Sequence, residues 1–175
     1  MAKNLPPPRV LPWACWEEWE TVHGALQASV VVGHGVNPEA AAPVVERVCG
    51  WRARGSLPLA VDATAQLLEL LALHGGVTEV SRRLALSMAV VRVVNGITDG
   101  KQKGKVAASV ASVAEAIGVP RWVVDIRHEA SHNALPDLPV AEAAALAMLG
   151  FLVDRYWTPQ AASLAEARSR SSLLA

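Results

Sequence analysis

The chain is poor in the residues that would place it among disulfide-stapled or membrane-spanning proteins. It has 2 cysteines, Cys15 and Cys49, which form neither a disulfide framework nor a Cys-x-x-Cys pair. Reduced thiols in the core of an intracellular protein are the simplest interpretation. The N-terminus lacks the apolar segment of a secretory signal. Charged residues or glycine interrupt every apolar stretch well before the roughly 18 residues that a membrane span needs, so no membrane segment is expected.

An excess of charge of one sign is also missing. Lys and Arg number 16, and Asp and Glu number 16, which gives a formal net charge of +0 and a pI near 7.0. This balance argues against a protein that binds nucleic acid through a strongly basic surface. It does not exclude an enzyme that contacts few phosphates, or one whose partner supplies the charge.

What the chain does have is enough apolar sequence for one sizeable domain. It contains 175 residues, of which 52% are hydrophobic and 18% are charged. A chain of this length buries roughly 70% of its unfolded surface, so it needs no disulfide or metal to hold its core. The composition indicates a flexible N-terminal segment at 1–10, a main domain at 11–158, and a C-terminal helix or tail at 159–175.

Hydrophobic residues recur at helical spacing, and proline and glycine punctuate the chain between these segments. No segment shows the alternating pattern of a strand bounded by hairpin turns, so we expect an all-α helical bundle. The expected helices cover about 16–32, 38–54, 58–74, 79–98, 106–117, 120–134, 139–157 and 159–172.

The six residues at 127–132, Arg-His-Glu-Ala-Ser-His, fit two unrelated catalytic patterns. His128 and His132 lie one helical turn apart and face the same way, as two ligands of one zinc ion would. Glu129 would then act as the general base of a zinc peptidase. However, this motif is not extended by a third histidine, no sheet is predicted to hold a peptide substrate, and neither Glu142 nor Glu166 is a compelling third ligand.

The second pattern is that of a metal-free ribonuclease. RNA cleavage needs a base for the 2′-hydroxyl, an acid for the leaving 5′-oxygen, and a cation for the charge at phosphorus. Histidine suits the first two functions because its pKa lies near neutrality, and arginine suits the third. Arg127, His128 and His132 supply these residue types. Because five helical steps turn Arg127 and His132 about 140° apart, they converge only if the helix loosens near Pro136 or if two chains pool their motifs across a two-fold axis.

The spacing alone also fits a simpler interpretation, in which the histidines belong to a solvated surface cluster with Asp125 and Glu129. The neighbouring lysine and arginine side chains also allow two interpretations. They could contact RNA phosphates or simply lie on a solvated turn. These candidate RNA-binding residues are Lys101, Lys103, Lys105 and Arg121.

Several longer stretches are together more specific than the six-residue motif. They are LPWACWEEW at 11–19, ERVCGWRARGSLPLAV at 46–61, SMAVVRVVNGITD at 87–99, GVPRWVVDIRHEASH at 118–132, LPDLP at 135–139, and Tyr156-Trp157. In this order, over about 11–157, they resemble the Las-one family of pre-rRNA-processing endoribonucleases, which carry a HEPN domain. Ser131 stands where the family usually has threonine.

The resemblance implies an all-α HEPN-like fold that forms a two-fold homodimer with a composite site. It implies metal-independent cleavage of pre-rRNA in the second internal transcribed spacer, leaving 2′,3′-cyclic phosphate and 5′-hydroxyl ends, with no cofactor. Arg127, His128 and His132 carry over as the catalytic residues; which histidine is the acid stays open. The family acts in the nucleus and nucleolus, and a tail distal to this domain engages a polynucleotide 5′-kinase of the Grc-three family.

Two alternatives to this enzyme stay open at the level of the sequence. The first is a non-catalytic HEPN scaffold that dimerises and presents RNA or a kinase partner. The second is the zinc peptidase described above. Loss of cleavage without loss of binding in His128→Ala and His132→Ala variants would separate the enzyme from the scaffold, and zinc analysis with a chelator would separate it from the peptidase.

Overall fold

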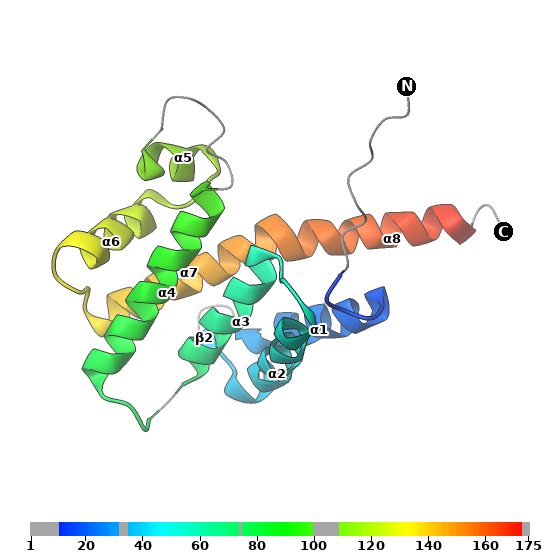
Figure 1. Ribbon diagram of the computed structural model, residues 1–175, viewed down its shortest axis with the longest axis horizontal. Helices are drawn as coiled ribbons and strands as arrows, with labels where there is room; N and C mark the ends of the chain where they lie inside the picture. The colour runs from blue at the N-terminus through cyan, green and yellow to red at the C-terminus, as the bar shows by residue number, and fades with distance from the viewer. Residues whose placement is uncertain (1–10, 32–34, 74, 100–108, 173–175) are drawn as a thin grey trace.

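The computed structural model describes residues 11–31, 35–73, 75–99 and 109–172, and most of them are helical (Figure 1). The all-α prediction is therefore confirmed. Among the described helices, none is long and apolar enough to cross a membrane. The elements are α1 (Trp16–Ser29), β1 (Val30–Val31), β2 (Gly35–Val36), α2 (Pro38–Arg54), α3 (Leu59–Ala72), α4 (Glu79–Asp99), α5 (Val110–Ala116), α6 (Arg121–His132), α7 (Leu138–Leu152), the π-helical turn η1 (Val153–Trp157) and α8 (Thr158–Ser172).

The N-terminal helices α1 and α2 pack together through tryptophans. Trp19 and Trp51 are completely buried, and the Trp19 ring stacks on Trp157 with 5.0 Å between ring centroids. The Trp51 indole N–H donates to Glu18 Oε1 over 2.9 Å. These tryptophans therefore hold helices together. Cys15 and Cys49 are exposed, so the expectation of core thiols was wrong.

A small hairpin replaces the predicted end of the first helix. Val30 pairs with Val36 in an antiparallel ladder of two short strands. The N–H of Asn37 donates to Ser29 O over 2.8 Å, and the Asn37 side chain caps α2 by accepting from the N–H of Glu39. Asparagine is a preferred helix cap, and β-branched valines fit a strand as well as a helix. The expected helix was therefore wrong at Val30 and Val31, and residue 32 lies outside the described residues.

Helix α4 is the centre of the fold, since it packs against α3, α5, α6 and α7. In Figure 1 it crosses the long α7 rod, with α5 and α6 on one side and the α1–α2 pair farther along the molecule. Its buried face carries apolar residues that join the main core. These include Leu86, Ala89, Val90, Val93 and Val94.

The last two expected helices are joined without a break. Helix α7 continues through η1 into α8, where the Thr158 N–H donates to Val153 O across the wider π turn. Such a turn accommodates Pro159, which has no N–H to donate within a helix. The Trp157 indole N–H donates to the Thr64 hydroxyl over 3.0 Å and anchors the turn on α3. The rod seen in Figure 1 is thus fixed at its middle.

The turn between α5 and α6 sets the direction of the motif helix. Gly118 has a φ of 89°, a conformation that strongly favours glycine. Its N–H donates to Glu115 O, and the N–H of Val119 donates to Ala114 O over 2.9 Å. This pair of bonds is a Schellman motif. It confirms that Gly118 ends the short helix, and it delivers the chain to Pro120 and α6.

Candidate active site

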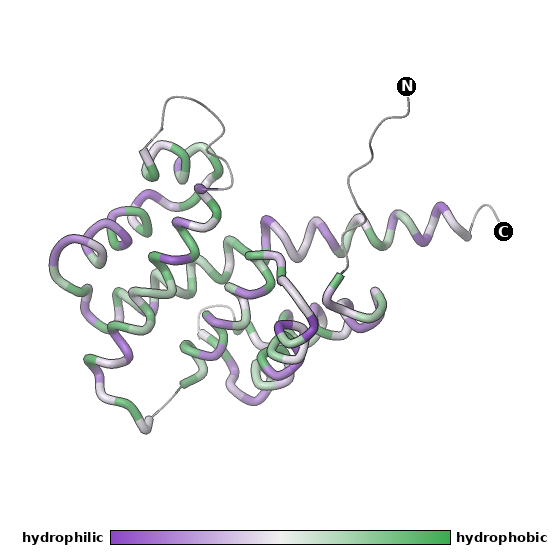
Figure 2. The backbone as a smooth tube through the Cα atoms, viewed as in Figure 1, coloured by the Kyte–Doolittle hydropathy of each residue, from purple (hydrophilic) through white to green (hydrophobic). Residues whose placement is uncertain are grey.

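The six-residue motif occupies the last turns of α6, as predicted. The helix begins at Arg121, after Pro120, and ends at His132, where the Asn133 N–H still donates to Glu129 O over 2.8 Å. Hydrophilic residues gather along α6, in contrast to the apolar α7 (Figure 2). The motif is therefore presented on a short polar helix that packs on α4, α5 and α7.

The two motif histidines are exposed neighbours. Their ring centroids lie 5.0 Å apart, with an interplanar angle of 51°. His128 and His132 are both exposed, so both rings are accessible to a bound molecule. An acid and a base of a reaction must both reach the substrate in this way.

Arg127 is held differently, because it points to α4. Its Nε donates to Asn95 Oδ1 over 2.9 Å, and its NH2 group donates to the same oxygen over 2.6 Å. The arginine is half-buried. Because the acceptor is a neutral amide, the guanidinium is fixed in place while its positive charge is not cancelled.

The helix remains regular from Arg127 to His132, so the loosening near Pro136 that would let the two converge within one chain is not seen. The Ser131 hydroxyl donates to Arg127 O over 2.8 Å, which is an ordinary bond within a helix. Glu129 Oε2 accepts from the Asn133 side-chain amide over 3.2 Å. Neither contact brings a further group to the histidines.

Sequence reasoning did not identify Asn95 as a functional residue. Asn95 follows Val80, Leu84 and Met88 along α4 at helical spacing, and these three apolar residues are 58%, 51% and 57% exposed. The sequence signal that could have identified Asn95 was its position as a polar residue at the end of an apolar helix face. We call this set of four residues the α4 face.

An arginine of α4, Arg83, fixes the loop that follows the motif through hydrogen bonds to its backbone. The Nε of Arg83 donates to Pro136 O over 2.8 Å, and its NH2 donates to Leu135 O over 2.9 Å. The preceding residue of α4, Arg82, pairs with Glu142 of α7 at 2.9 Å. The position of His132 is therefore fixed from both sides, by α6 before it and by a clamped loop after it.

A groove of about 380 Å³ lies between α5 and α6, directly beside the motif. Arg127 and His128 form part of its wall, and Arg121 lies at the start of α6. It is named here the α5–α6 groove. It is lined by Ser109, Val110, Ala111, Arg121, Val124, Asp125, Arg127 and His128.

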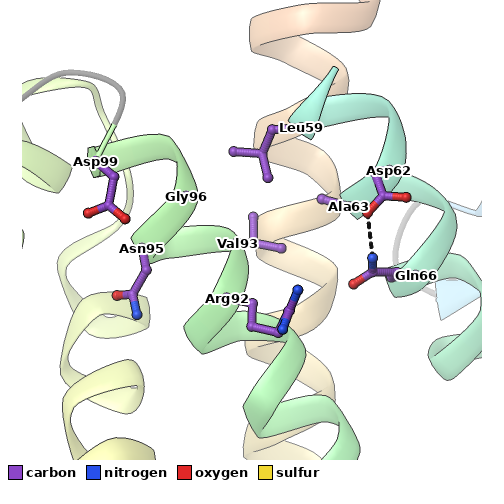
Figure 3. A pocket seen from close by; sticks show the side chains of 9 residues that line it. All are labelled: Leu59, Asp62, Ala63, Gln66, Arg92, Val93, Asn95, Gly96 and Asp99. Carbon is purple, nitrogen blue, oxygen red and sulfur yellow. Dashed lines mark hydrogen bonds between the residues drawn. The ribbon is translucent and has the colours of Figure 1, made fainter. Parts of the chain in front are cut away.

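Another hollow, of about 290 Å³, lies between α3 and α4 (Figure 3). Arg92 points toward Gln66 there, while Asn95 lies on the other side of the α4 ribbon, which agrees with its bonds to Arg127 of α6. Asp62 accepts from the Gln66 side-chain amide over 2.6 Å. Asn95 is nevertheless one of the residues that line this α3–α4 hollow.

The candidate RNA-binding residues have mixed outcomes. Lys101, Lys103 and Lys105 lie outside the described residues, so their role stays a prediction. Arg121 is exposed on α6 and pairs with Asp125, with 3.0 Å between Nε and Oδ1. Its position beside His128 in the α5–α6 groove is compatible with RNA binding.

The zinc interpretation finds little support in this geometry. Within residues 11–172, apart from the undescribed gaps, no three His, Cys, Asp or Glu side chains gather where they could hold a metal ion. A catalytic zinc site normally has three protein ligands. The His128–His132 pair supplies two.

Comparison with known proteins gives a consistent result. A family model described as Las1-like matches residues 11–159. The chain is 36% identical over 122 residues to the pre-rRNA-processing protein las1 of Schizosaccharomyces pombe, covering 70% of this chain. It is 34% identical over 164 residues to protein LAS1 of Saccharomyces cerevisiae, covering 88%. It is 30% identical over 155 residues to the ribosomal biogenesis protein LAS1L of Mus musculus, covering 86%.

The matched region is a minor part of each relative. It spans 25% of the Schizosaccharomyces pombe protein, 32% of the Saccharomyces cerevisiae protein and 19% of the Mus musculus protein. The activity and partners of those whole proteins therefore do not transfer automatically to this chain.

Proposed function

The chain belongs to the Las1-like family, and on that premise we propose that it is a HEPN-type endoribonuclease domain that acts in pre-rRNA processing. Two relatives are named for pre-rRNA processing and ribosomal biogenesis. The substrate is the second internal transcribed spacer of pre-rRNA, and the site of action is the nucleus and nucleolus. The whole protein works with a polynucleotide 5′-kinase of the Grc-three family.

The proposed reaction uses only groups of the motif. One histidine takes the proton of the 2′-hydroxyl, and the 2′-oxygen then attacks the adjacent phosphorus. The bond from phosphorus to the 5′-oxygen breaks, and the other histidine donates a proton to that oxygen. The products carry a 2′,3′-cyclic phosphate and a 5′-hydroxyl. Arg127 stabilises the extra negative charge on the phosphoryl oxygens as the five-coordinate state forms.

The observation that carries this proposal is the combination of a fixed cation with two exposed rings. Arg127 is held by Asn95 through two N–H groups, and its remaining N–H groups keep the planar geometry that suits phosphate oxygens. The rings of His128 and His132 are one turn apart with 5.0 Å between centroids. Positioning of this kind lowers the barrier because the groups need little rearrangement during the reaction.

We place the complete site between two copies of the chain. In one copy, the regular helix turns Arg127 and His132 to different sides of α6, about 140° apart. The α4 face supports a two-fold pairing, because Leu84 and Met88 are large, apolar and about half exposed. The same face ends at Asn95, which contacts Arg127. A second copy seated there would bring its own motif close to this one.

The direct test is cleavage of a pre-rRNA spacer transcript in the presence of EDTA, followed by analysis of both new ends. We expect cleavage to persist, with 2′,3′-cyclic phosphate and 5′-hydroxyl products. Substituting Arg127, His128 or His132 by alanine should abolish cleavage and leave RNA binding measurable. Ser163→Ala, at an exposed serine on α8, is the control that should keep full activity.

Three outcomes would overturn the proposal. Cleavage that survives both histidine substitutions would place the reaction elsewhere. RNA binding with no cleavage by the unsubstituted protein would indicate a scaffold. Stoichiometric zinc together with activity abolished by EDTA would restore the metallopeptidase-type site.

A further inference from the structure

We propose that the α5–α6 groove binds the nucleotide next to the scissile phosphate and that Arg121 contacts the phosphate on the far side of that nucleotide. The inference rests on the proposed ribonuclease function and adds to it a substrate subsite. It depends on three features of the groove: its continuity with the histidines, its apolar walls, and the held cation at its outer end.

The first feature is a continuous row of polar side chains on one face of α6. Arg121, Asp125, His128 and His132 follow one another at steps of four, three and four residues, so they lie above one another on the helix. At 1.5 Å per residue the row is about 16 Å long. The groove occupies the part of the row from Arg121 to His128. A strand whose scissile phosphate lies at the two rings would therefore continue into the groove.

The second feature is the character and size of the walls. Val110 and Ala111 of α5 face Val124 of α6 across the groove, and Val124 is only 4% exposed. A volume of about 380 Å³ lies in the range of roughly 300–1,000 Å³ that is usual for small-ligand pockets. Apolar walls suit the face of a base, while Ser109 and Asp125 offer polar groups to its edge or to the ribose.

The third feature is the way that Arg121 is held. Its Nε donates to Asp125 Oδ1 over 3.0 Å, and 65% of the arginine side chain is exposed. An arginine bound through Nε keeps the terminal N–H groups of its fork pointing outward, where they match two oxygens of a phosphate. Asp125 therefore fixes the direction of Arg121 while leaving most of its side chain exposed, and a bound phosphate would compete with this carboxylate for the guanidinium. Arg121 and Arg127 both line the groove, so it has a cation near the start of α6 and another beside His128.

The α3–α4 hollow is the competing location, and its charge disfavours RNA. Asp62 and Asp99 both line it, against one cation, Arg92 (Figure 3). Asp62 accepts from Arg52 as well as from Gln66. Two carboxylates repel a phosphate backbone, and neither His128 nor His132 lines the hollow. Arg92 is nevertheless the matched control, because it is an exposed arginine that lines a groove of similar size.

The experiment measures binding of 2′-O-methyl octaribonucleotides of A, C, G and U by fluorescence anisotropy, at several salt concentrations. These probes cannot be cleaved, because the attacking hydroxyl is blocked. We expect Arg121→Glu to weaken binding roughly 10-fold and Arg121→Ala to lower the slope of log affinity against log salt by about 1. Ala111→Leu, which narrows the groove without changing charge, should weaken binding and alter the order of preference among the four bases. Arg92→Ala should bind as the unsubstituted protein does.

The outcomes separate this inference from the proposed function. If Arg121→Glu and Ala111→Leu bind as tightly as the unsubstituted protein, or if Arg92→Ala is the variant that weakens binding, the groove assignment is wrong even where cleavage is intact. If both groove variants weaken binding but no RNA is cut by the unsubstituted protein, the subsite stands and the ribonuclease chemistry fails. Thermal unfolding of Arg121→Ala, an exposed position, shows whether a loss of binding reflects a loss of folded protein.

Discussion

Arg127 of α6 and Asn95 of α4 are joined by two hydrogen bonds to a single oxygen, at 2.9 Å from Nε and 2.6 Å from NH2. The two residues are separated by 32 positions in the chain. The amide oxygen fixes the plane of the guanidinium without adding negative charge beside it. A carboxylate at the same place would hold the arginine as firmly but would compete with the phosphate for its charge.

This relationship predicts a graded response at position 95. Asn95→Ala should lower kcat for RNA cleavage by roughly 10- to 100-fold, because a catalytic group displaced by about 1 Å loses a large part of its effect. KM should change much less. Asn95→Asp should lower kcat further, since the new carboxylate neutralises the cation. Steady-state kinetics on a spacer oligonucleotide would measure both constants.

A double-mutant cycle distinguishes positioning from a general loss of fold. In an Arg127→Lys background that keeps residual cleavage, Asn95→Ala should have little further effect, because the planar guanidinium that Asn95 holds is already gone. Gln66→Ala, which removes a half-buried side-chain amide on the other side of α4, should leave kcat unchanged. Independent, additive losses at Asn95 and Arg127 would show that Asn95 does not act through the arginine.

The α4 face leads to a prediction about self-association. Met88→Glu and Leu84→Glu each place a charge in the surface that we propose a second copy contacts. The dissociation constant of the dimer should therefore rise 10-fold or more, which corresponds to about 1.4 kcal/mol. The free energy of unfolding of the monomer should change by less than about 0.5 kcal/mol, because these side chains are about half exposed already. Sedimentation equilibrium measures the first quantity and denaturant unfolding the second.

Activity should follow the dimer in these variants. Specific activity of Met88→Glu should rise with protein concentration, as the weakened dimer forms again by mass action. Ala165→Glu adds the same charge at an exposed position on α8 and should neither dissociate the dimer nor lower activity. A monomeric Met88→Glu protein with full specific activity would contradict a shared site.

Mixing two inactive chains tests the shared site itself. Arg127→Ala chains and His132→Ala chains should each be inactive alone. In a mixed dimer, one of the two sites combines the intact Arg127 of one chain with the intact His132 of the other. Random pairing should therefore restore about a quarter of the original activity, since about half of the dimers are mixed and each has one intact site. No recovery after exchange of subunits, verified by sedimentation of tagged chains, would place all the catalytic groups in one chain.

The sequence predicted the helices well where proline and glycine marked their ends. Pro38 and Gly118 stand where α2 begins and α5 ends, because each has a conformation that the helix terminus requires. It failed at Val30–Val31 and at Pro159. There the outcome depended on a pairing with Val36 and on a π turn anchored by Trp157, and neither contact leaves a local pattern.

For the candidate site too, local features were predicted from the sequence, while contacts between distant segments were not. The order of Arg127, His128 and His132 along one helix was visible in the sequence because helical periodicity is local. The bond from Arg127 to Asn95 was not visible, because it depends on how α6 packs on α4. The clamp from Arg83 to the carbonyls at 135 and 136 is likewise a contact between distant segments. Such contacts follow from the packing of the fold and not from spacing.

Glu18 links the first two helices and should make the fold sensitive to acid. Burial opposes ionisation of its carboxyl group. This effect is outweighed by hydrogen bonds from the Ala14 N–H at 2.7 Å and the Trp51 indole at 2.9 Å, and by the nearby charges of Arg54 and Arg47, so its pKa is lowered from the usual 4.5. A carboxyl whose pKa is lower in the folded state stabilises the fold above its unfolded pKa. That stability is lost as the pH falls through 4.5 toward the lowered value.

Glu18→Gln should therefore flatten the dependence of stability on pH. At pH 7 the variant should be less stable by about 1–2 kcal/mol, because a glutamine keeps part of the hydrogen bonding but not the charge. Between about pH 5 and pH 3 it should lose less stability than the unsubstituted protein, since one of the groups that takes up a proton on unfolding is gone. Urea unfolding followed by tryptophan fluorescence measures both curves, with Glu166→Gln on the exposed side of α8 as the control. Parallel curves for Glu18→Gln and the unsubstituted protein would show that this carboxylate is not coupled to folding.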